Sequence, residues 1–151
     1  SIYGDQDSDR KQEDLTGNVL SPYALSKKIN EQYAEIFYRT YDFKTVGLRY
    51  FNVFGPMQSP LGEYSAVIPK WVGSMINNED IYINGDGSTS RDFCFVKNVV
   101  QANILGAVHC KNLDYECFNV ACGDSTSLLQ LFKIIKDRSV NMWMNKELEV
   151  I

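Results

Sequence analysis

The sequence of 151 residues predicts an α/β fold. Segments whose apolar residues recur at helical spacing alternate with short runs rich in valine, isoleucine and aromatic residues. Turns that contain glycine, proline or aspartate separate these segments. The composition, 44% hydrophobic, 13% aromatic and 23% charged, is typical of a globular chain with a packed core.

The first half of the chain predicts a polar loop, a long helix and a buried strand. Ser21 as N-cap and Pro22 as first helical residue predict a helix that continues to about Tyr41. Residues 45–54 predict a buried strand, which a Gly-Pro dipeptide ends. Helical spacing predicts that the helix buries an apolar stripe of Leu25, Ile29, Tyr33 and Ile36.

The second half predicts a continued alternation of helices and strands. We expect helices at residues 65–75, 97–109 and 125–138, and strands at residues 81–83, 92–96 and 116–120. A glycine-rich turn is expected between the strands at 81–83 and 92–96. The apolar alternation of residues 148–151 predicts the start of a further strand.

Composition and cysteine usage argue against several classes of function. The net charge of −4 lacks the basic excess of a nucleic-acid-binding arm, so no nucleic acid is expected as a partner. The uncharged stretches are too short or too mixed to span a bilayer, so no membrane partner is expected. No metal site is expected, because the four cysteines have no C-x-x-C spacing; they favour reduced thiols in a cytoplasmic protein.

Tyr23 and Lys27 form the pair with the clearest chemical meaning. Four residues apart on the expected helix, a phenol and an ammonium group share one face. A nearby positive charge stabilises a phenolate, which can act as a general base. An exposed tyrosine beside a solvated lysine would give the same spacing. The pair alone therefore does not decide between a catalytic base and an ordinary helix surface.

Further segments in a fixed order accompany this pair. They are YG at residues 3–4, LSPYALSK at 20–27, LRYFNVFGP at 48–56, NGDGSTSRDF at 84–93 and FNVACG at 118–123. Together they resemble the segments of the extended short-chain dehydrogenase/reductase family, which includes NAD-dependent epimerases and dehydratases. The resemblance covers essentially the whole chain. The branch that the chain resembles is that of bacterial UDP-N-acetylglucosamine 4-epimerases, related to UDP-glucose 4-epimerases.

The resemblance implies the C-terminal part of a Rossmann-type parallel sheet plus a smaller α/β substrate-binding lobe. The glycine-rich NAD loop of the family has no counterpart here, because Gly85 and Gly87 lead into an expected strand instead of a helix. We therefore expect a fragment whose NAD-binding front half precedes residue 1. The implied domains are the Rossmann domain at 1–58 and 97–124, and the substrate lobe at 59–96 and 125–151.

The resemblance also implies roles for single residues at the cofactor. Tyr23 would be the catalytic base, and Lys27 would be its partner and would also hydrogen-bond the nicotinamide ribose. Tyr50 and Phe51 would line the nicotinamide pocket, although two core aromatics on a buried strand would give the same pattern. The implied cofactor is NAD.

Other residues would contact a nucleotide sugar. Asn52 would donate to the substrate diphosphate and Arg91 would clamp it, a task suited to a planar, permanently charged group. Ser1 stands where dehydratase branches carry a glutamate that removes the C5 proton, and a serine cannot do this, so it favours an epimerase. We expect Ala66 and Val67, at a helix N-terminus, to lie near the uridine. We expect Tyr82 and Asn84 to flank the uracil.

The implied function is that of an isomerase, which epimerises C4 of a UDP-hexose or UDP-N-acetylhexosamine through a 4-keto intermediate. The alternatives are a 4,6-dehydratase, decarboxylase or reductase of the same family, and a non-catalytic nucleotide-sugar-binding protein. The fragment alone is expected to be inactive. A homodimer is expected, because the first helix resembles the pairing helix of the family. Dimerisation or packing within the subunit would explain its added apolar residues Tyr33, Phe37, Tyr38 and Tyr41.

Overall fold

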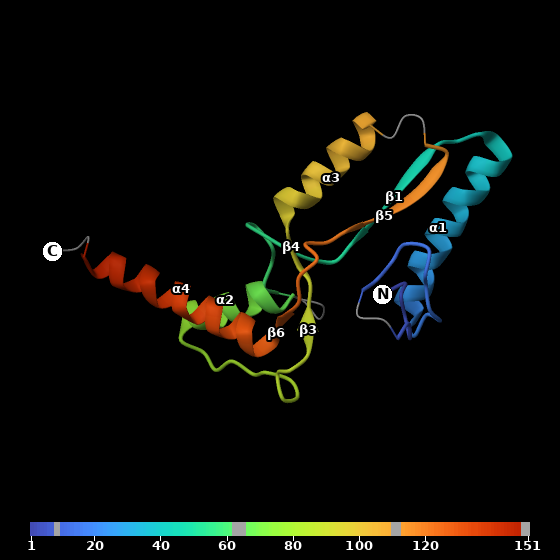
Figure 1. Cartoon of the computed structure of the whole chain (residues 1–151). Coiled ribbons are helices and arrows are strands. Elements are labelled where there is room, and N and C mark those ends of the chain that lie inside the picture. Colours follow the sequence, from blue (N-terminus) through green and yellow to red (C-terminus); the bar gives the residue numbers. More distant parts are fainter. Residues whose placement is uncertain (8–9, 62–65, 110–112, 149–151) are drawn as a thin grey trace. The chain divides into compact units, whose positions relative to one another are not determined.

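The computed structural model describes residues 1–7, 10–61, 66–109 and 113–148. Helices and short strands alternate along the chain (Figure 1). Two of the strand pairs are parallel, and the predicted α/β class is confirmed. The elements are α1 (Pro22–Tyr41), β1 (Thr45–Tyr50), β2 (Asn52–Phe54), α2 (Val67–Asn77), β3 (Ser90–Arg91), β4 (Phe93–Phe95), α3 (Val96–His109), β5 (Tyr115–Val120), β6 (Thr126–Ser127) and α4 (Leu128–Leu148).

The chain divides into two compact units. The first contains Ser1–Tyr50 and Asn98–Val120, and the second contains Phe51–Lys97 and Ala121–Ile151. The chain changes unit at residues 50/51, 97/98 and 120/121, whereas the domain segments expected from the sequence change at 58/59, 96/97 and 124/125. The units are defined by contacts within this chain, and the assignment of domains in a whole protein stays a prediction.

The first unit is built on the parallel pair of β1 and β5, in which Thr45 faces Tyr115 and Tyr50 faces Val120. Side chains alternate between the two faces of a strand. Arg49 points to α1, where it contacts Glu31, whereas Tyr50 points to α3. The helices α1 and α3 therefore cover opposite faces of the strand pair (Figure 1).

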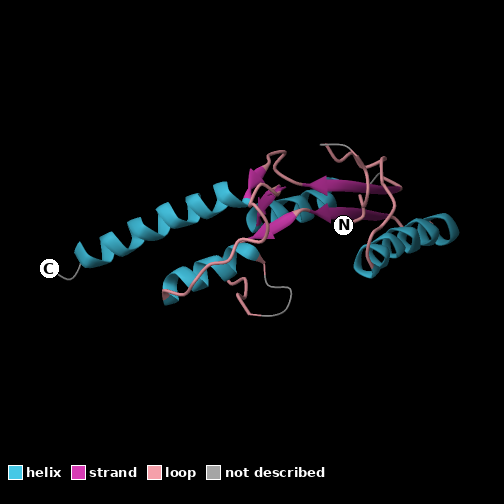
Figure 2. Ribbon diagram, turned by 90° about the horizontal axis from the view of Figure 1, so that it is seen from below, coloured by secondary structure: helices cyan, strands magenta, loops and turns pink. Residues whose placement is uncertain are grey.

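The second unit contains two strand pairs and two helices. Strand β2 runs parallel to β4, with Asn52 opposite Phe93, and β3 runs antiparallel to β6. Figure 2 shows α2 and α4 side by side, and they meet through Trp71 and Phe132, whose ring centroids lie 5.9 Å apart in an edge-to-face arrangement. Trp71 is buried, and so is Cys94 of β4. Edge-to-face packing of this kind stabilises a core beyond the area that it buries.

The strand predicted at residues 45–54 is two strands. Phe51 interrupts it, and β1 and β2 pair with different partners, β5 and β4. The strand predicted at residues 92–96 is present as β4, but it is shorter, because it contains only Phe93–Phe95 and Val96 begins α3. The apolar residues at 45–54 correctly predicted extended backbone. They did not indicate that the chain leaves the first unit between residues 50 and 51.

Three further element predictions need correction. Residues 81–83 form no strand: Tyr82 is exposed and its two isoleucine neighbours are half-buried, so the alternation of burial persists without a pairing partner. The last helix begins at Leu128, after the short strand β6, and continues to Leu148. Leu148 is therefore helical, and the remainder of the strand expected at 148–151 lies outside the described residues.

The apolar stripe of α1 is exposed, which contradicts the prediction that it is buried. The face of α1 that meets the strand pair contains Ala24, which is buried, and Glu31, which forms an ion pair with Arg49. The apolar stripe lies on a neighbouring face of the helix, which is exposed. Their exposed fractions are 47% for Leu25, 38% for Ile29, 63% for Tyr33 and 53% for Ile36.

Candidate active site

The N-terminus of α1 places Tyr23 and Lys27 on one helix face, as predicted. The side chain of Ser21 accepts a hydrogen bond of 3.1 Å from the backbone N–H of Ala24 and so caps the helix. The Nζ atom of Lys27 lies 5.3 Å from the ring centroid of Tyr23. The side chain of Tyr23 is 64% exposed, so its hydroxyl is accessible to a molecule in solution.

The segment that carries Ser1 is held by the Tyr-Gly pair that follows it. Tyr3 is buried, whereas Ser1 is exposed. Gly4 has φ of +49°, and a Cβ atom at this position would lie 1.7 Å from the carbonyl oxygen of Asn18. Only glycine tolerates both the left-handed backbone and this approach. The neighbouring Asp5 carboxylate accepts a hydrogen bond of 2.7 Å from the backbone N–H of Asn18.

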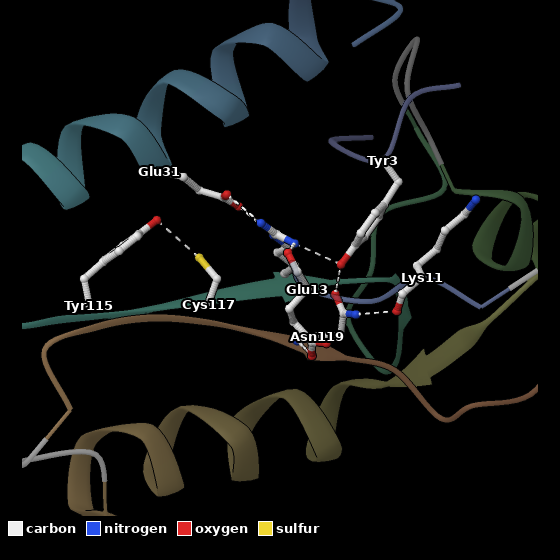
Figure 3. A network of polar contacts seen from close by, with 8 residues as sticks. Tyr3, Lys11, Glu13, Glu31, Tyr115, Cys117 and Asn119 are labelled. Atoms are coloured by element: carbon white, nitrogen blue, oxygen red, sulfur yellow. Dashed lines mark hydrogen bonds and ion pairs between the residues drawn. The ribbon is translucent and has the colours of Figure 1, made fainter. Parts of the chain in front are cut away.

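Arg49 is the centre of a polar network in the first unit, and Figure 3 labels its partners Tyr3, Glu13 and Glu31. Its Nε and Nη2 atoms each donate to a carboxylate oxygen of Glu31 at 2.8 Å. Its Nη1 atom donates to the Tyr3 hydroxyl at 3.0 Å and to the Glu13 carbonyl at 2.9 Å. The Tyr3 hydroxyl in turn donates to the side-chain oxygen of Asn119. Hydrogen bonding to Glu31 raises the pKa of Arg49 further above its ordinary value.

This network joins four parts of the chain: the N-terminal segment, α1, β1 and β5. The side chains of Arg49 and Glu31 are only 12% and 24% exposed, so the fork-shaped pair is protected from solvent. No local pattern in the sequence predicts a role for Arg49, Glu31 or Asn119. The position of Arg49 within an expected buried strand was nevertheless informative, because a buried charge requires a partner.

Tyr115 and Cys117 lie beside this network on β5 (Figure 3). The Tyr115 hydroxyl and the Cys117 Sγ atom are 3.4 Å apart. Burial raises the pKa of both groups above their ordinary values. A thiol held in its neutral form is a weak nucleophile, so Cys117 behaves as a structural residue.

Tyr50 lies at the end of β1 and points to α3. Its hydroxyl donates a hydrogen bond of 3.0 Å to the side-chain oxygen of Asn103, and Asn103 donates to the Val99 carbonyl at 2.7 Å. Tyr50 is half exposed, so it is not the fully buried core residue of the alternative interpretation. Phe51, its neighbour in the sequence, begins the second unit.

In the second unit, Asn52 and Arg91 lie on elements that Asp92 connects. The backbone N–H and the side-chain Nδ2 atom of Asn52 each donate to the Asp92 carbonyl at 3.1 Å. Arg91 is exposed on β3, and its Nη1 atom donates to the Ser90 carbonyl at 2.8 Å. The remaining N–H groups of this guanidinium can bind an anion.

Ala66 and Val67 form the N-terminus of α2, as expected to within two residues. Ala66 is the N-cap residue and provides no side-chain hydrogen bond. The first N–H groups of the helix are therefore available to an acceptor from outside the helix.

Tyr82 and Asn84 are exposed residues of an irregular segment that leads into the glycine-rich turn. Asp86 shapes this turn by accepting bonds from the backbone N–H of Ser88 at 3.0 Å and from its hydroxyl at 2.7 Å. Gly87 has φ of +72°, and a Cβ atom there would lie 2.7 Å from Leu129. The turn thus packs directly against the start of α4.

The described residues contain no group of three or more histidine, cysteine, aspartate or glutamate side chains that could hold a metal ion. Of the helices described, none is sufficiently long and apolar to cross a membrane. Cys94, Cys117 and Cys122 belong to the described residues, with Cys94 buried and Cys122 exposed, whereas Cys110 lies outside them.

Parallel strand pairs flanked by helices, with a tyrosine and a lysine one turn apart, are features of a Rossmann-type α/β enzyme. The chain belongs to the NAD dependent epimerase/dehydratase family, which its sequence matches over residues 1–121. The resemblance deduced from the sequence is thereby confirmed. The cofactor prediction is confirmed as well, because the family is NAD dependent and related structures were solved with NAD.

Individual relatives are sugar-nucleotide enzymes. A putative UDP-glucose 4-epimerase of Methanocaldococcus jannaschii is 39% identical over 136 residues, which cover 90% of this chain and 43% of the relative. A UDP-N-acetylglucosamine 4-epimerase from Methanobrevibacter ruminantium M1, solved in complex with UDP-N-acetylmuramic acid, has 42% sequence identity to this chain. The two structures match with a TM-score of 0.83 over 90% of this chain and 43% of that one.

A UDP-glucuronic acid 4-epimerase from Bacillus cereus, solved with UDP-glucuronic acid and NAD, is 27% identical with a TM-score of 0.83, over 92% of this chain and 43% of that one. Further relatives include 4,6-dehydratases of dTDP-D-glucose and a decarboxylase of a UDP-linked sugar acid. The chain thus spans less than half of the length of the relatives that it matches.

Proposed function

We propose that the whole protein to which this sequence belongs epimerises C4 of a UDP-hexose or UDP-N-acetylhexosamine. The observation that carries this proposal is the Tyr23–Lys27 pair, exposed on one face of α1 in a member of an epimerase/dehydratase family. The 4-epimerases among the relatives support the reaction class.

In this mechanism Tyr23 acts as the catalytic base. Its phenolate removes the proton of the sugar 4-hydroxyl, and the same oxygen returns a proton after the 4-keto sugar has rotated. The Nζ atom of Lys27 lies 5.3 Å from the centroid of the Tyr23 ring, so a positive charge lies close to the proposed base. Because α1 is tied to β1 through Glu31 and Arg49, the base is held on a rigid element.

The residues of α1 also fit a nicotinamide ribose. An exposed phenol hydroxyl and an exposed ammonium, one helical turn apart, provide donors of the type that a ribose diol accepts. Tyr50, half exposed at the end of β1, and Phe51 are proposed to lie at the nicotinamide ring. A bound NAD⁺ would supply the hydride-transfer chemistry at C4 of the sugar.

The second unit is proposed to bind the nucleotide. Arg91 has exposed guanidinium N–H groups for the diphosphate, and Asn52 lies on the strand β2 next to the segment that carries Arg91. The uncapped N–H groups after Ala66, at Val67 and beyond, suit an anion. Tyr82 and Asn84 are exposed and are proposed to flank the uracil, and Ser1 is proposed to face the sugar.

The substrate and the reaction can be tested together by product analysis. Incubating the whole protein with UDP-N-acetylglucosamine or UDP-glucose and recording ¹H NMR spectra should show the C4 epimer. A 4-keto-6-deoxy sugar would instead support the dehydratase alternative, which the serine at position 1 argues against. Binding of UDP without any product would support a non-catalytic nucleotide-sugar-binding protein.

Assembly and compartment complete the proposal. We propose a homodimer formed through α1, on which Tyr33, Phe37 and Tyr41 are exposed and Tyr38 is half-buried. We also propose a cytoplasmic location, in keeping with the interpretation of the cysteines as reduced thiols.

A further inference from the structure

Asp92 lies between β3 and β4 and binds two distant segments with two different groups. Its carboxylate accepts hydrogen bonds from three consecutive backbone N–H groups: Cys122 at 2.9 and 3.1 Å, Gly123 at 2.7 Å and Asp124 at 3.3 Å. Its backbone carbonyl accepts two bonds from Asn52, both of 3.1 Å. One residue thus joins the turn after β5 to the start of β2.

The turn at residues 122–124 presents backbone donors that suit an anion. Three converging N–H groups form a concave donor site of the kind that binds anions, and Gly123, with φ of +73°, gives the backbone the necessary curvature. Two carboxylate oxygens satisfy three donors, whereas an amide has one oxygen to accept with and an NH₂ group that only donates. Bonds between a charged acceptor and N–H groups are stronger than neutral ones.

The same residue fixes the strand that carries Arg91. Arg91 immediately precedes Asp92, and it pairs with Thr126 of β6 across the antiparallel ladder. The hydroxyl of Ser125 donates to the Ser90 hydroxyl at 2.8 Å. Both residues of β3, Ser90 and Arg91, are therefore bound to the residues that directly follow the turn at 122–124.

We propose that Asp92 is the positioning residue for binding of the nucleotide diphosphate: it fixes Asn52 and Arg91 in one arrangement without touching the substrate. The proposal rests on the proposed function, which places these two residues at the diphosphate. Because Asp92 acts only on the part of the site that binds phosphate, its loss weakens recognition of the diphosphate and spares recognition of the nucleoside.

The test compares UDP with uridine on the whole protein. Asp92→Asn and Asp92→Ala are compared with wild type and with Asp86→Asn, a change in a nearby aspartate whose turn an amide oxygen can still support. UDP affinity is measured by calorimetry and the weaker binding of uridine by NMR titration. We expect about a tenfold loss of UDP affinity in both Asp92 variants, unchanged uridine binding, and no effect of Asp86→Asn.

Each other outcome overturns the proposal. Wild-type UDP affinity in both Asp92 variants would show that the positions of Asn52 and Arg91 do not depend on the Asp92 carboxylate, and would overturn the proposal. Equal losses for UDP and uridine would show a general structural role, and Asp92→Asn, which keeps the size of the side chain, makes that comparison even if the alanine variant does not fold. A wild-type protein that binds neither ligand would contradict the proposed function itself, and this inference with it.

Discussion

Gly4 shows how a single residue fixes the segment that precedes the catalytic helix. Its positive φ of +49° and the 1.7 Å approach of a virtual Cβ atom to Asn18 exclude every side chain. Gly85 also has a positive φ, of +72°, but nothing lies within 4 Å of its virtual Cβ atom. The two glycines therefore separate the cost of backbone strain from the cost of a clash.

We predict that Gly4→Ala destabilises the protein more than Gly85→Ala does. The Gly85 variant should lose about 1–2 kcal/mol, the cost of a left-handed backbone for a residue with a side chain. The Gly4 variant should lose more, because the loop around Asn18 must also move. Urea denaturation of the whole protein measures both values, and equal losses would show that the close approach at Asn18 does not constrain this segment.

At the scale of the element, α1 is attached to β1 by a partly buried ion pair. Arg49 and Glu31 meet through two parallel hydrogen bonds, and Arg49 also reaches Tyr3. Helix α1 carries a second, exposed ion pair between Arg39 and Glu35, whose side chains are 67% and 40% exposed. The same helix thus provides an internal control for the effect of burial.

We predict that Arg49→Lys lowers the free energy of unfolding by about 2–4 kcal/mol, because lysine cannot form the fork that pairs with Glu31 and leaves a partly buried carboxylate poorly paired. Arg39→Lys should change it by less than about 0.5 kcal/mol, as expected for an exposed pair. Thermal and urea unfolding of the two variants provide the comparison. A loss at Arg49 no larger than that at Arg39 would show that the network does not anchor α1.

The sequence predicted whether a segment is a helix or a strand better than it predicted which surface that segment packs against. Helix α1 begins and ends as expected, because Ser21 and Pro22 are local signals. The outward direction of Leu25 and Ile29 could not be read from spacing, since helical periodicity defines a stripe but not the surface that covers it. The break at Phe51 was missed because consecutive apolar residues pair equally well with one partner or with two.

The candidate site was predictable only where a short segment carries a whole chemical group. Tyr23 and Lys27 lie on one helix, and their shared face follows from a spacing of four residues. Asp92 binds Asn52 and the turn at 122–124, which are distant in the sequence, and no local pattern predicts such a contact. The Arg49 network joins four segments and was missed for the same reason.

At the scale of the whole molecule, the residues with proposed roles belong to both compact units. Tyr23, Lys27 and Tyr50 belong to the first unit, and Asn52 and Arg91 to the second. The only near match to a dinucleotide fingerprint in the sequence, at residues 85–90, leads into strand β3 instead of a helix. The sequence therefore lacks the fingerprint of a pyrophosphate-binding loop.

We predict that the 151-residue chain by itself does not bind NAD tightly. Without a glycine-rich strand–turn–helix, the donors of Tyr23 and Lys27 meet only the ribose part of the cofactor. Equilibrium dialysis of the purified chain against NAD should leave no stoichiometric complex, whereas the whole protein should retain the cofactor. Tight one-to-one binding by the 151-residue chain would contradict this prediction.

We also predict that Ile36→Glu, in the exposed apolar face of α1, converts the whole protein from dimer to monomer. A charge in a buried apolar contact is costly, whereas on a solvated helix face it is tolerated. Light scattering coupled to size-exclusion chromatography measures the mass, and Glu35→Gln on the same helix is the control. A variant that stays dimeric would place the dimer contact elsewhere.

The most direct test of the central claim is the turnover of Tyr23→Phe in the whole protein. Removing the hydroxyl removes the proposed base, so epimerisation should fall by at least about a hundredfold, while UDP binding remains unchanged. Tyr33→Phe, a change in another exposed tyrosine of α1, should retain wild-type turnover. Epimerisation by Tyr23→Phe at a rate comparable to wild type would contradict the assignment of Tyr23 as the catalytic base.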